Sequence, residues 1–286
     1  MFDILGYSFM QRALLASTLI GVVCAVIGVY VVLKGLAFIG SGIAHASFGG
    51  VALGFLFGWN IVLTATLFSL AGALGIGMVS RRSEVREDTA IGIFFTTSMA
   101  IGVVLVSRLE GYYQDLFGFL FGSVLAVTPA DLWLSGLLGL GVLLVIALFY
   151  KELTFISFDQ EMAQVIGVPA VSLYYLLLAL IALTIVISIR VVGIILVEAL
   201  IVTPAAAAYQ LTDDFRRMMA IAVGIGVTSA VSGLFLSAML DVASGATIVL
   251  TVTLLFGAAA LLSPRRRRVA AVAPGGAEEP SSWAAE

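Results

Sequence analysis

The longest charge-free segment of the chain, residues 35–80, most limits what this sequence can fold into. It contains no Asp, Glu, Lys or Arg and is long enough for two crossings of a bilayer, since one helical crossing needs about 20 mainly apolar residues. Of the 286 residues, 62% are hydrophobic and 11% are charged, whereas a soluble domain averages about 25% charged residues. This composition excludes a water-soluble protein and predicts a polytopic membrane protein.

Further apolar segments of spanning length recur along the whole chain. Besides two helices within 35–80, the candidates are 13–33, 89–107, 132–150, 170–189, 191–212, 218–240 and 242–263. They predict an all-α fold with eight or nine transmembrane helices, the count being open in the Gly-rich first 80 residues. The first apolar segment is too long for the core of a signal peptide, so we interpret it as a retained helix.

Two shorter regions complete the expected organisation. Residues 116–130 are apolar but too short to cross, which predicts a re-entrant or interfacial helix between two spans. We expect one transmembrane domain, residues 1–264, followed by a basic and then disordered tail, residues 265–286, because the tail is rich in Ala, Pro, Gly and Glu.

Basic residues predict the orientation, because cytoplasmic loops are enriched in Lys and Arg. If the spans alternate, one side receives a large group of basic residues: Arg81, Arg82, Arg86, Lys151, Arg216, Arg217 and Arg265 to Arg268. Arg108 and Arg190 fall on the other side. We therefore predict that the basic side and the C-terminus are cytoplasmic, while Arg12 and Lys34 flank the first helix and leave the N-terminus undecided.

Small residues repeat every four positions around the lone histidine, His45. They are Gly42, Ala46, Gly50, Gly54 and Gly58. A ridge of small residues on one helix face lets another helix backbone approach closely. An intramembrane histidine faces protein or a water-filled cavity, and neutral imidazole binds zinc, iron, copper and nickel. His45 is therefore either a packing residue bonded to a backbone carbonyl or a metal ligand, with Ser41 one turn before it.

Two carboxylates could supply oxygen ligands. Glu198 is the acidic residue that lies clearly inside a predicted span, and a lone carboxylate there needs a partner. It either pairs with Arg190 or binds a cation. Asp241 ends a span on the outer side, where the simplest interpretation is a solvated helix-end charge. Cys24 is the single cysteine, which excludes an internal disulfide and a cysteine-built metal site.

The segment from Lys151 to Val171 predicts a short amphipathic helix on the cytoplasmic side. Ser157 and Gln160 fit a capping box, and Gly167 and Pro169 would end the helix. Its apolar face carries Phe158, Met162, Val165 and Ile166, and its acidic residues are Asp159 and Glu161. The helix either rests on lipid or docks a cytoplasmic partner.

The chain carries no G-x-x-x-x-G-K-[ST] loop, since neither of its lysines, Lys34 and Lys151, follows a glycine. It therefore cannot act as a P-loop ATPase by itself. No arrangement of paired carboxylates, or of a nucleophile with histidine, predicts an enzyme. No bound cofactor and no nucleic-acid partner are expected.

Five segments together resemble the membrane permease of the metal-ion ABC importers, the zinc/manganese/iron group. They are FMQRALLAS (Phe9–Ser17), VLKGLAFIGSGIAHASFGGVALG (Val32–Gly54), SFDQEMAQVIGVP (Ser157–Pro169), VVGIILVEALIVTPAAAA (Val191–Ala208) and LDVASGATIVL (Leu240–Leu250). The resemblance covers roughly residues 9–263. It implies a bacterial or archaeal plasma membrane, a separate cytoplasmic ATPase, an external metal-binding protein and a second permease copy, with a homodimer expected.

The resemblance also assigns roles to residues. Asp159–Val168 matches the coupling helix of the family, and His45 matches its histidine in the translocation path. Many members carry aspartate where this chain has Ser41, so one expected carboxylate is missing and Glu198 could compensate. The cargo is expected to be a divalent ion, zinc first, with manganese or iron as alternatives. A secondary transporter that uses Glu198, and a permease for metal chelates, are the competing interpretations.

Overall fold

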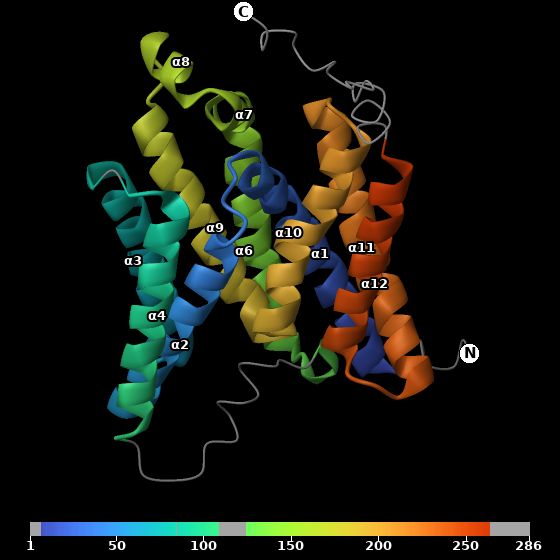
Figure 1. Ribbon diagram of the computed structural model, residues 1–286. Coiled ribbons are helices and arrows are strands. Elements are labelled where there is room, and N and C mark those ends of the chain that lie inside the picture. The colour runs from blue at the N-terminus through green and yellow to red at the C-terminus, as the bar shows by residue number, and fades with distance from the viewer. Residues whose placement is uncertain (1–6, 84, 109–123, 264–286) are drawn as a thin grey trace, which may run out of the picture.

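The computed structural model describes residues 7–83, 85–108 and 124–263, and all regular secondary structure in these ranges is helical (Figure 1). By length and composition, nine helices in this part of the chain can cross a membrane. They are α1 (Ser8–Leu33), α2 (Ile39–Phe57), α3 (Ile61–Arg82), α4 (Glu87–Val106), α6 (Pro129–Leu148), α9 (Ala170–Val192), α10 (Ile194–Leu211), α11 (Phe215–Leu240) and α12 (Ser244–Leu262). The predicted all-α membrane fold is confirmed, with the higher of the two expected helix counts.

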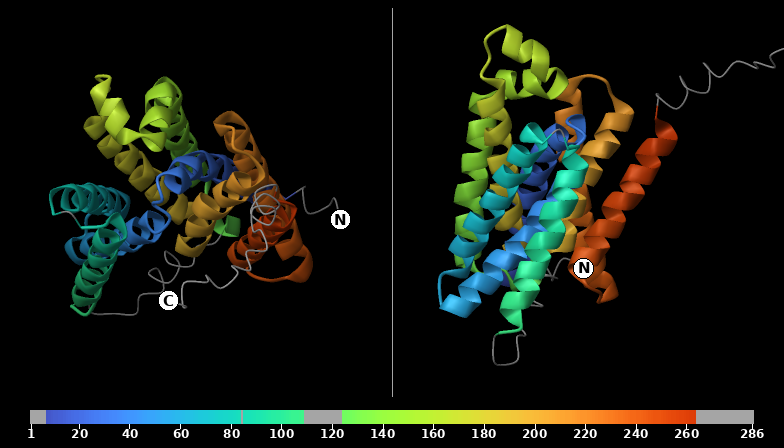
Figure 2. Two further views of the ribbon diagram at one scale, coloured as in Figure 1. Left: turned by 45° about the horizontal axis from the view of Figure 1, so that its top comes forward. Right: turned by 60° about the vertical axis from the view of Figure 1, so that its left-hand side comes forward.

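The helices form two packed groups. Helices α2, α3 and α4 pack on one another, while α1, α10, α11 and α12 form the second group (Figures 1 and 2). Helix α9 contacts members of both groups, and α6 packs against α1 and α9. The two groups also meet directly where α2 contacts α10. This contact brings together two of the side chains that the sequence singles out.

Contacts at one end of the bundle define which helix ends share a face. Two short helices, α7 (Tyr150–Phe158) and α8 (Gln160–Val165), lie there, at the top of Figure 1. Lys34, which follows α1, donates a hydrogen bond to Gln160 at 2.8 Å, so the end of α1 lies on this face. The chain therefore enters its first span from the opposite face. Which face is cytoplasmic stays a prediction, and the tail lies outside the described residues.

The predicted re-entrant segment falls mostly on residues 109–123, which are outside the described ranges. Its last part forms a 3₁₀ turn, Val124–Ala126, and the start of α6. Thr128 caps α6 by accepting from the backbone N–H of Asp131 at 3.2 Å, while the Asp131 carboxylate accepts from the backbone N–H of Thr128. The re-entrant helix therefore stays a prediction.

The ridge of small residues on α2 is confirmed as a packing surface. A methyl group built on Gly50 or Gly54 would lie 2.6 Å or 2.7 Å from atoms of α3, and one on Gly42 would lie 2.8 Å from a side chain of α4. Ala46 faces α3 in the same way. Gly58 has another role, since it ends α2 in the left-handed conformation at φ 67°. The ridge thus joins α2 to α3 and α4.

The predicted capping box at Ser157 and Gln160 is wrong. The Ser157 hydroxyl donates to the carbonyl of Leu153 inside α7 at 2.7 Å. Asp159 caps α8 instead, because its carboxylate accepts from the backbone N–H of Met162 at 2.8 Å. Ser157 is still part of α7, so its hydroxyl is committed to the preceding turn. The helix spans the six residues Gln160–Val165 and is shorter than the segment Asp159–Val168 that matches the coupling helix of the family.

Candidate metal-path site

His45 lies in the second turn of α2, where three neighbours fix its imidazole ring. Nδ1 is 2.9 Å from the backbone carbonyl oxygen of Ser41 and 3.5 Å from Oε1 of Glu198 on α10. Phe95 on α4 meets the ring edge to face, with 4.6 Å between the ring centroids. The side chains of His45 and Glu198 are 25% and 28% exposed, so the pair is partly buried.

These contacts determine which imidazole nitrogen is available to a ligand. A carbonyl oxygen only accepts, so the contact with Ser41 requires the proton on Nδ1. In a neutral imidazole, Nε2 then carries the free lone pair. Metal-bound histidines generally donate their other N–H to a carbonyl or a carboxylate in this way. The packing and metal-ligand interpretations of His45 are therefore compatible, because each uses a different nitrogen.

Glu198 is not neutralised by arginine. Arg190 pairs with Asp131 at the start of α6 instead, with 2.6 Å between Nε and Oδ1. Within the described residues, the buried Oε1 atom of Glu198 accepts no hydrogen bond, and Nδ1 of His45 lies 3.5 Å from it. The alternative of a Glu198–Arg190 pair is thus not what the structure shows.

The remaining predicted ligands lie differently. Asp241 is exposed where α11 ends, in the left-handed conformation at φ 53°. In the ranges that the structure describes, no three His, Cys, Asp or Glu side chains come together, so Asp241 does not join His45 and Glu198. Ser41 contacts the imidazole through its backbone carbonyl. The metal-ligand roles of all four residues stay predictions.

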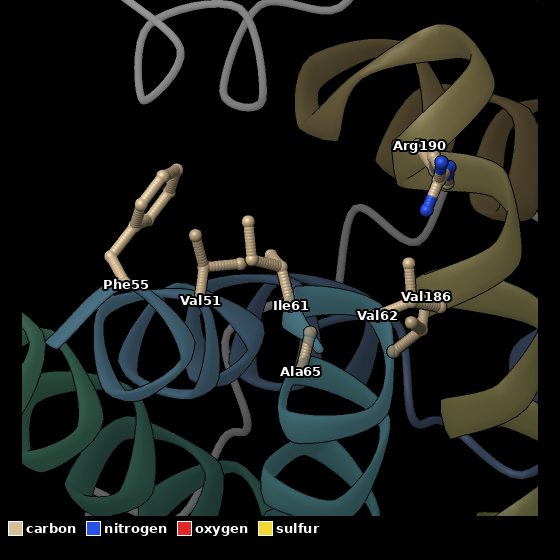
Figure 3. A pocket seen from close by; sticks show the side chains of 7 residues that line it. All are labelled: Val51, Phe55, Ile61, Val62, Ala65, Val186 and Arg190. Atoms are coloured by element: carbon tan, nitrogen blue, oxygen red, sulfur yellow. The ribbon is translucent and has the colours of Figure 1, made fainter. Parts of the chain in front are cut away.

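An apolar cavity of about 260 Å³ lies farther along α2 (Figure 3). Its lining comes from α2, α3 and α9: Val51, Phe55, Ile61, Val62, Ala65, Val186 and Arg190. Arg190, which is paired with Asp131, is the one charged residue of this lining, and none of the seven lining residues is His, Cys, Asp or Glu. The cavity does not suit a metal ion, and sequence reasoning did not predict it.

Helix α8 presents apolar side chains outward. Phe158, Met162, Val165 and Ile166 are 61%, 52%, 80% and 61% exposed. Ala163 faces the bundle and is fully buried. Glu161 is exposed beside this apolar patch, and Asp159 and Gly167 (φ 87°) hold the two ends of α8. Phe158 ends α7 and its ring meets that of Phe215 on α11 at 6.1 Å, so Met162, Val165 and Ile166 are the part of the predicted apolar face that points away from the protein.

Sequence reasoning missed three partners at these sites. Phe95 lies in an apolar segment whose pattern gives no signal for a contact with His45. Asp131 carries a capping-box signal, T-x-x-D from Thr128, but nothing that predicts the pair with Arg190. The bond between Lys34 and Gln160 joins residues 126 positions apart, which no local pattern can indicate.

The nine helices of spanning length in the described residues define a polytopic membrane protein. The model of the ABC 3 transport family matches residues 6–263. The chain therefore belongs to this family and is a membrane permease of an ABC transport system.

Named relatives and a solved structure agree with this assignment. The manganese transport system membrane protein MntC of Halalkalibacterium halodurans is 44% identical over 89% of this chain and 87% of its own length. The chelated iron transport system membrane protein YfeD of Yersinia pestis is 38% identical over 88% of this chain and 84% of its length. The structure of PsaBC from Streptococcus pneumoniae, in complex with Fab, matches with a TM-score of 0.83 and 34% identity over 94% of this chain and 96% of that chain.

Proposed function

We propose that this permease imports a divalent transition-metal ion, with manganese as the first cargo to test, and that a separate ATPase drives it. The observation that carries the proposal is the pair formed by His45 and Glu198 between α2 and α10. The pair offers one imidazole nitrogen and one carboxylate to an ion. Relatives with manganese and chelated-iron transport names support the same class of cargo.

The chemistry of the His45–Glu198 pair suits an ion that passes through the membrane rather than one that stays bound. A dehydrated divalent ion inside a bilayer needs negative charge nearby, and Glu198 supplies it. Carboxylate and carbonyl oxygens suit manganese, whereas imidazole also suits zinc and iron. Conduction requires a site that binds weakly enough for the ion to leave, and two side-chain ligands meet that condition. The sequence alone favoured zinc as the cargo, whereas the names of the relatives favour manganese.

Partners and orientation follow from the exposed face of α8. We propose that Phe158, Met162 and Val165 enter a cleft on the cytoplasmic ATPase, with Asp159 and Glu161 at its polar rim. Gly167 ends the helix so that α9 can return into the membrane. In this proposal the α7–α8 face lies in the cytoplasm. An external metal-binding protein delivers the ion to the opposite face, and a second copy of the permease completes the assembly within the lipid bilayer.

The test is uptake into vesicles that contain the permease and its ATPase, with the external metal-binding protein added outside. Radioactive manganese should accumulate only with ATP inside. His45→Ala and Glu198→Gln should each abolish uptake while membrane insertion and ATPase binding persist. Asp88→Asn, which removes an exposed carboxylate at the start of α4, is the matched control and should transport normally. Normal uptake by His45→Ala would refute the site.

A chelate permease is the second candidate, because one relative is named for chelated iron. The same vesicles distinguish it, since free manganese, zinc and iron can be offered beside chelated iron. Uptake of the chelate alone, unaffected by His45→Ala, would favour this candidate. Uptake without any ATPase would instead indicate a secondary transporter.

A further inference from the structure

A group of polar contacts connects α8 to the rest of the bundle. Lys34 Nζ donates to the side-chain oxygen of Gln160 on α8 at 2.8 Å. The same ammonium lies 5.5 Å from the centre of the Tyr174 ring on α9, and Tyr174 donates to a carboxylate oxygen of Glu87 on α4 at 2.7 Å. Burial lowers the pKa of Lys34, and the Glu87 charge opposes that shift. Lys34 is therefore a partly buried cation that contacts α8 and α9.

Hydrogen bonds hold both ends of helix α8, so that it can move as one short rigid unit. Asp159 caps its first turn. Beyond its last turn, Gly167 is left-handed, and the N–H of Val168 bonds the carbonyl of Ala163 at 2.9 Å while that of Gly167 bonds Gln164. This is a Schellman motif, which satisfies the last helix carbonyls. A force on the exposed apolar face of α8 therefore displaces Gln160 and does not unwind the ends of the helix.

The junction between α1 and α2 has the same motif. Gly35 is left-handed at φ 71°, and the N–H of Leu36 bonds the carbonyl of Val31 at 2.9 Å. Leu36 is fully buried, so it anchors the junction. Lys34 is the residue immediately before Gly35, and α2 begins at Ile39. A displacement of Lys34 therefore moves the start of α2.

The candidate metal-path site lies close to that start. His45 is six residues beyond Ile39, about 9 Å along the helix axis at 1.5 Å per residue, and Ser41 lies between them. A second route runs through Tyr174 and Glu87 to α4, whose Phe95 packs on the imidazole. Two of the three helices that contact the His45 ring, α2 and α4, therefore begin beside the Lys34 contacts.

We infer that the hydrogen bond between Lys34 and Gln160 is the link by which movement of α8 repositions His45. Lys34 and Gln160 act as positioning residues, since neither touches the ion. The inference rests on the proposed function, because it requires the ATPase to act on α8. The movement of α8 is thereby transmitted through one side-chain contact, which lies outside the apolar face of α8 that is proposed to dock on the ATPase.

The test compares ATP hydrolysis with manganese uptake in vesicles that contain the complete transporter. Lys34→Met and Gln160→Leu should keep ATP hydrolysis but move about tenfold fewer ions per ATP, the equilibrium factor expected for loss of a charged hydrogen bond. The exchange variant K34Q/Q160K restores the donor and acceptor and should recover most of the ratio. Lys151→Met and Gln164→Leu, which alter exposed residues on α7 and α8, are matched controls and should keep the ratio.

Each outcome decides a different point. A merely structural role predicts that hydrolysis, uptake and assembly fall together and that K34Q/Q160K brings no recovery, which would overturn the link. An unchanged number of ions moved per ATP in Gln160→Leu would also overturn the link. This variant keeps the partly buried Lys34, so it still tests the link if Lys34→Met fails to assemble. If the unaltered complex shows no ATP-dependent uptake, the proposed function fails and the link fails with it.

Discussion

The contact between α2 and α3 should be sensitive to one added methyl group. In Gly50→Ala, the new Cβ would lie 2.6 Å from the carbonyl oxygen of Thr64, 2.7 Å from Cα of Ala65 and 2.8 Å from Cβ of Phe68. Two of these three atoms are backbone atoms, so rotation of a side chain cannot relieve the overlap. Ordinary contact begins at 3.4 Å, so α2 and α3 must separate by several tenths of an ångström.

The magnitude follows from two opposing effects. Overpacking of this kind costs about 1–3 kcal/mol, while replacing a helical glycine by alanine gains about 1 kcal/mol. Gly40→Ala on the same helix is the control, because no atom lies within 4 Å of its built Cβ. The two effects leave a net cost of up to about 2 kcal/mol, so we expect Gly50→Ala to melt up to about 8 °C below the unaltered protein, and Gly40→Ala to melt at the same temperature or higher.

The assay uses the single cysteine of the chain. Cys24 on α1 is fully buried, so a thiol-reactive dye should label it only as the detergent-solubilised bundle opens. The melting temperature is read from the rise of fluorescence. Equal melting temperatures for Gly50→Ala and Gly40→Ala would refute the reasoning that close backbone contact, rather than helix propensity, selects glycine at position 50.

Three further predictions follow from the same structure. Met162→Asp on the exposed face of α8 should uncouple ATP hydrolysis from uptake, whereas Gln164→Asp should not; normal uptake in both would make α8 a lipid-surface helix. A cysteine at Ser83 should resist membrane-impermeant thiol reagents in intact cells, and one at Asn60, at the other end of α3, should react; the reverse result would invert the proposed orientation. Ser41→Asp should keep manganese uptake, since it supplies the carboxylate that the family resemblance implies at this position, and loss of uptake would show that the site needs the present contact geometry.

Much of the fold could be predicted because hydropathy alone determines which segments must leave water. The expected spans 132–150 and 191–212 correspond to α6 and α10, which begin at Pro129 and Ile194. The boundary between α9 and α10 was displaced because Gly193, at φ 82°, interrupts a continuous apolar run. The face at which α1 begins was left open by the sequence, because Arg12 and Lys34 flank this helix one at each end; the contact of Lys34 with Gln160, a residue distant in sequence, locates it.

The candidate site could be predicted only in part, for a physical reason. His45 stands out because it is the lone imidazole, and Glu198 because a carboxylate inside a span is costly. Their proximity is a property of the packing of α2 on α10, which the ridge of small residues does not specify. The partner of Arg190 was equally open, since the choice between Asp131 and Glu198 depends on where α6 begins relative to α9.

Glu198 and the carboxylate that Arg190 binds instead, Asp131, lead to the last prediction. Asp131 receives the guanidinium and two hydrogen bonds from Thr128, whereas the described residues give Oε1 of Glu198 no hydrogen bond. An unsatisfied buried acceptor destabilises a fold, and such a cost persists where function needs it. A cation that passes through the site would give this oxygen the partner that it otherwise lacks. Glu198→Gln should therefore melt at a higher temperature than the unaltered permease in the Cys24 assay while losing manganese uptake. A lower melting temperature with uptake retained would show that Glu198 stabilises the packing of α10 and does not serve the ion.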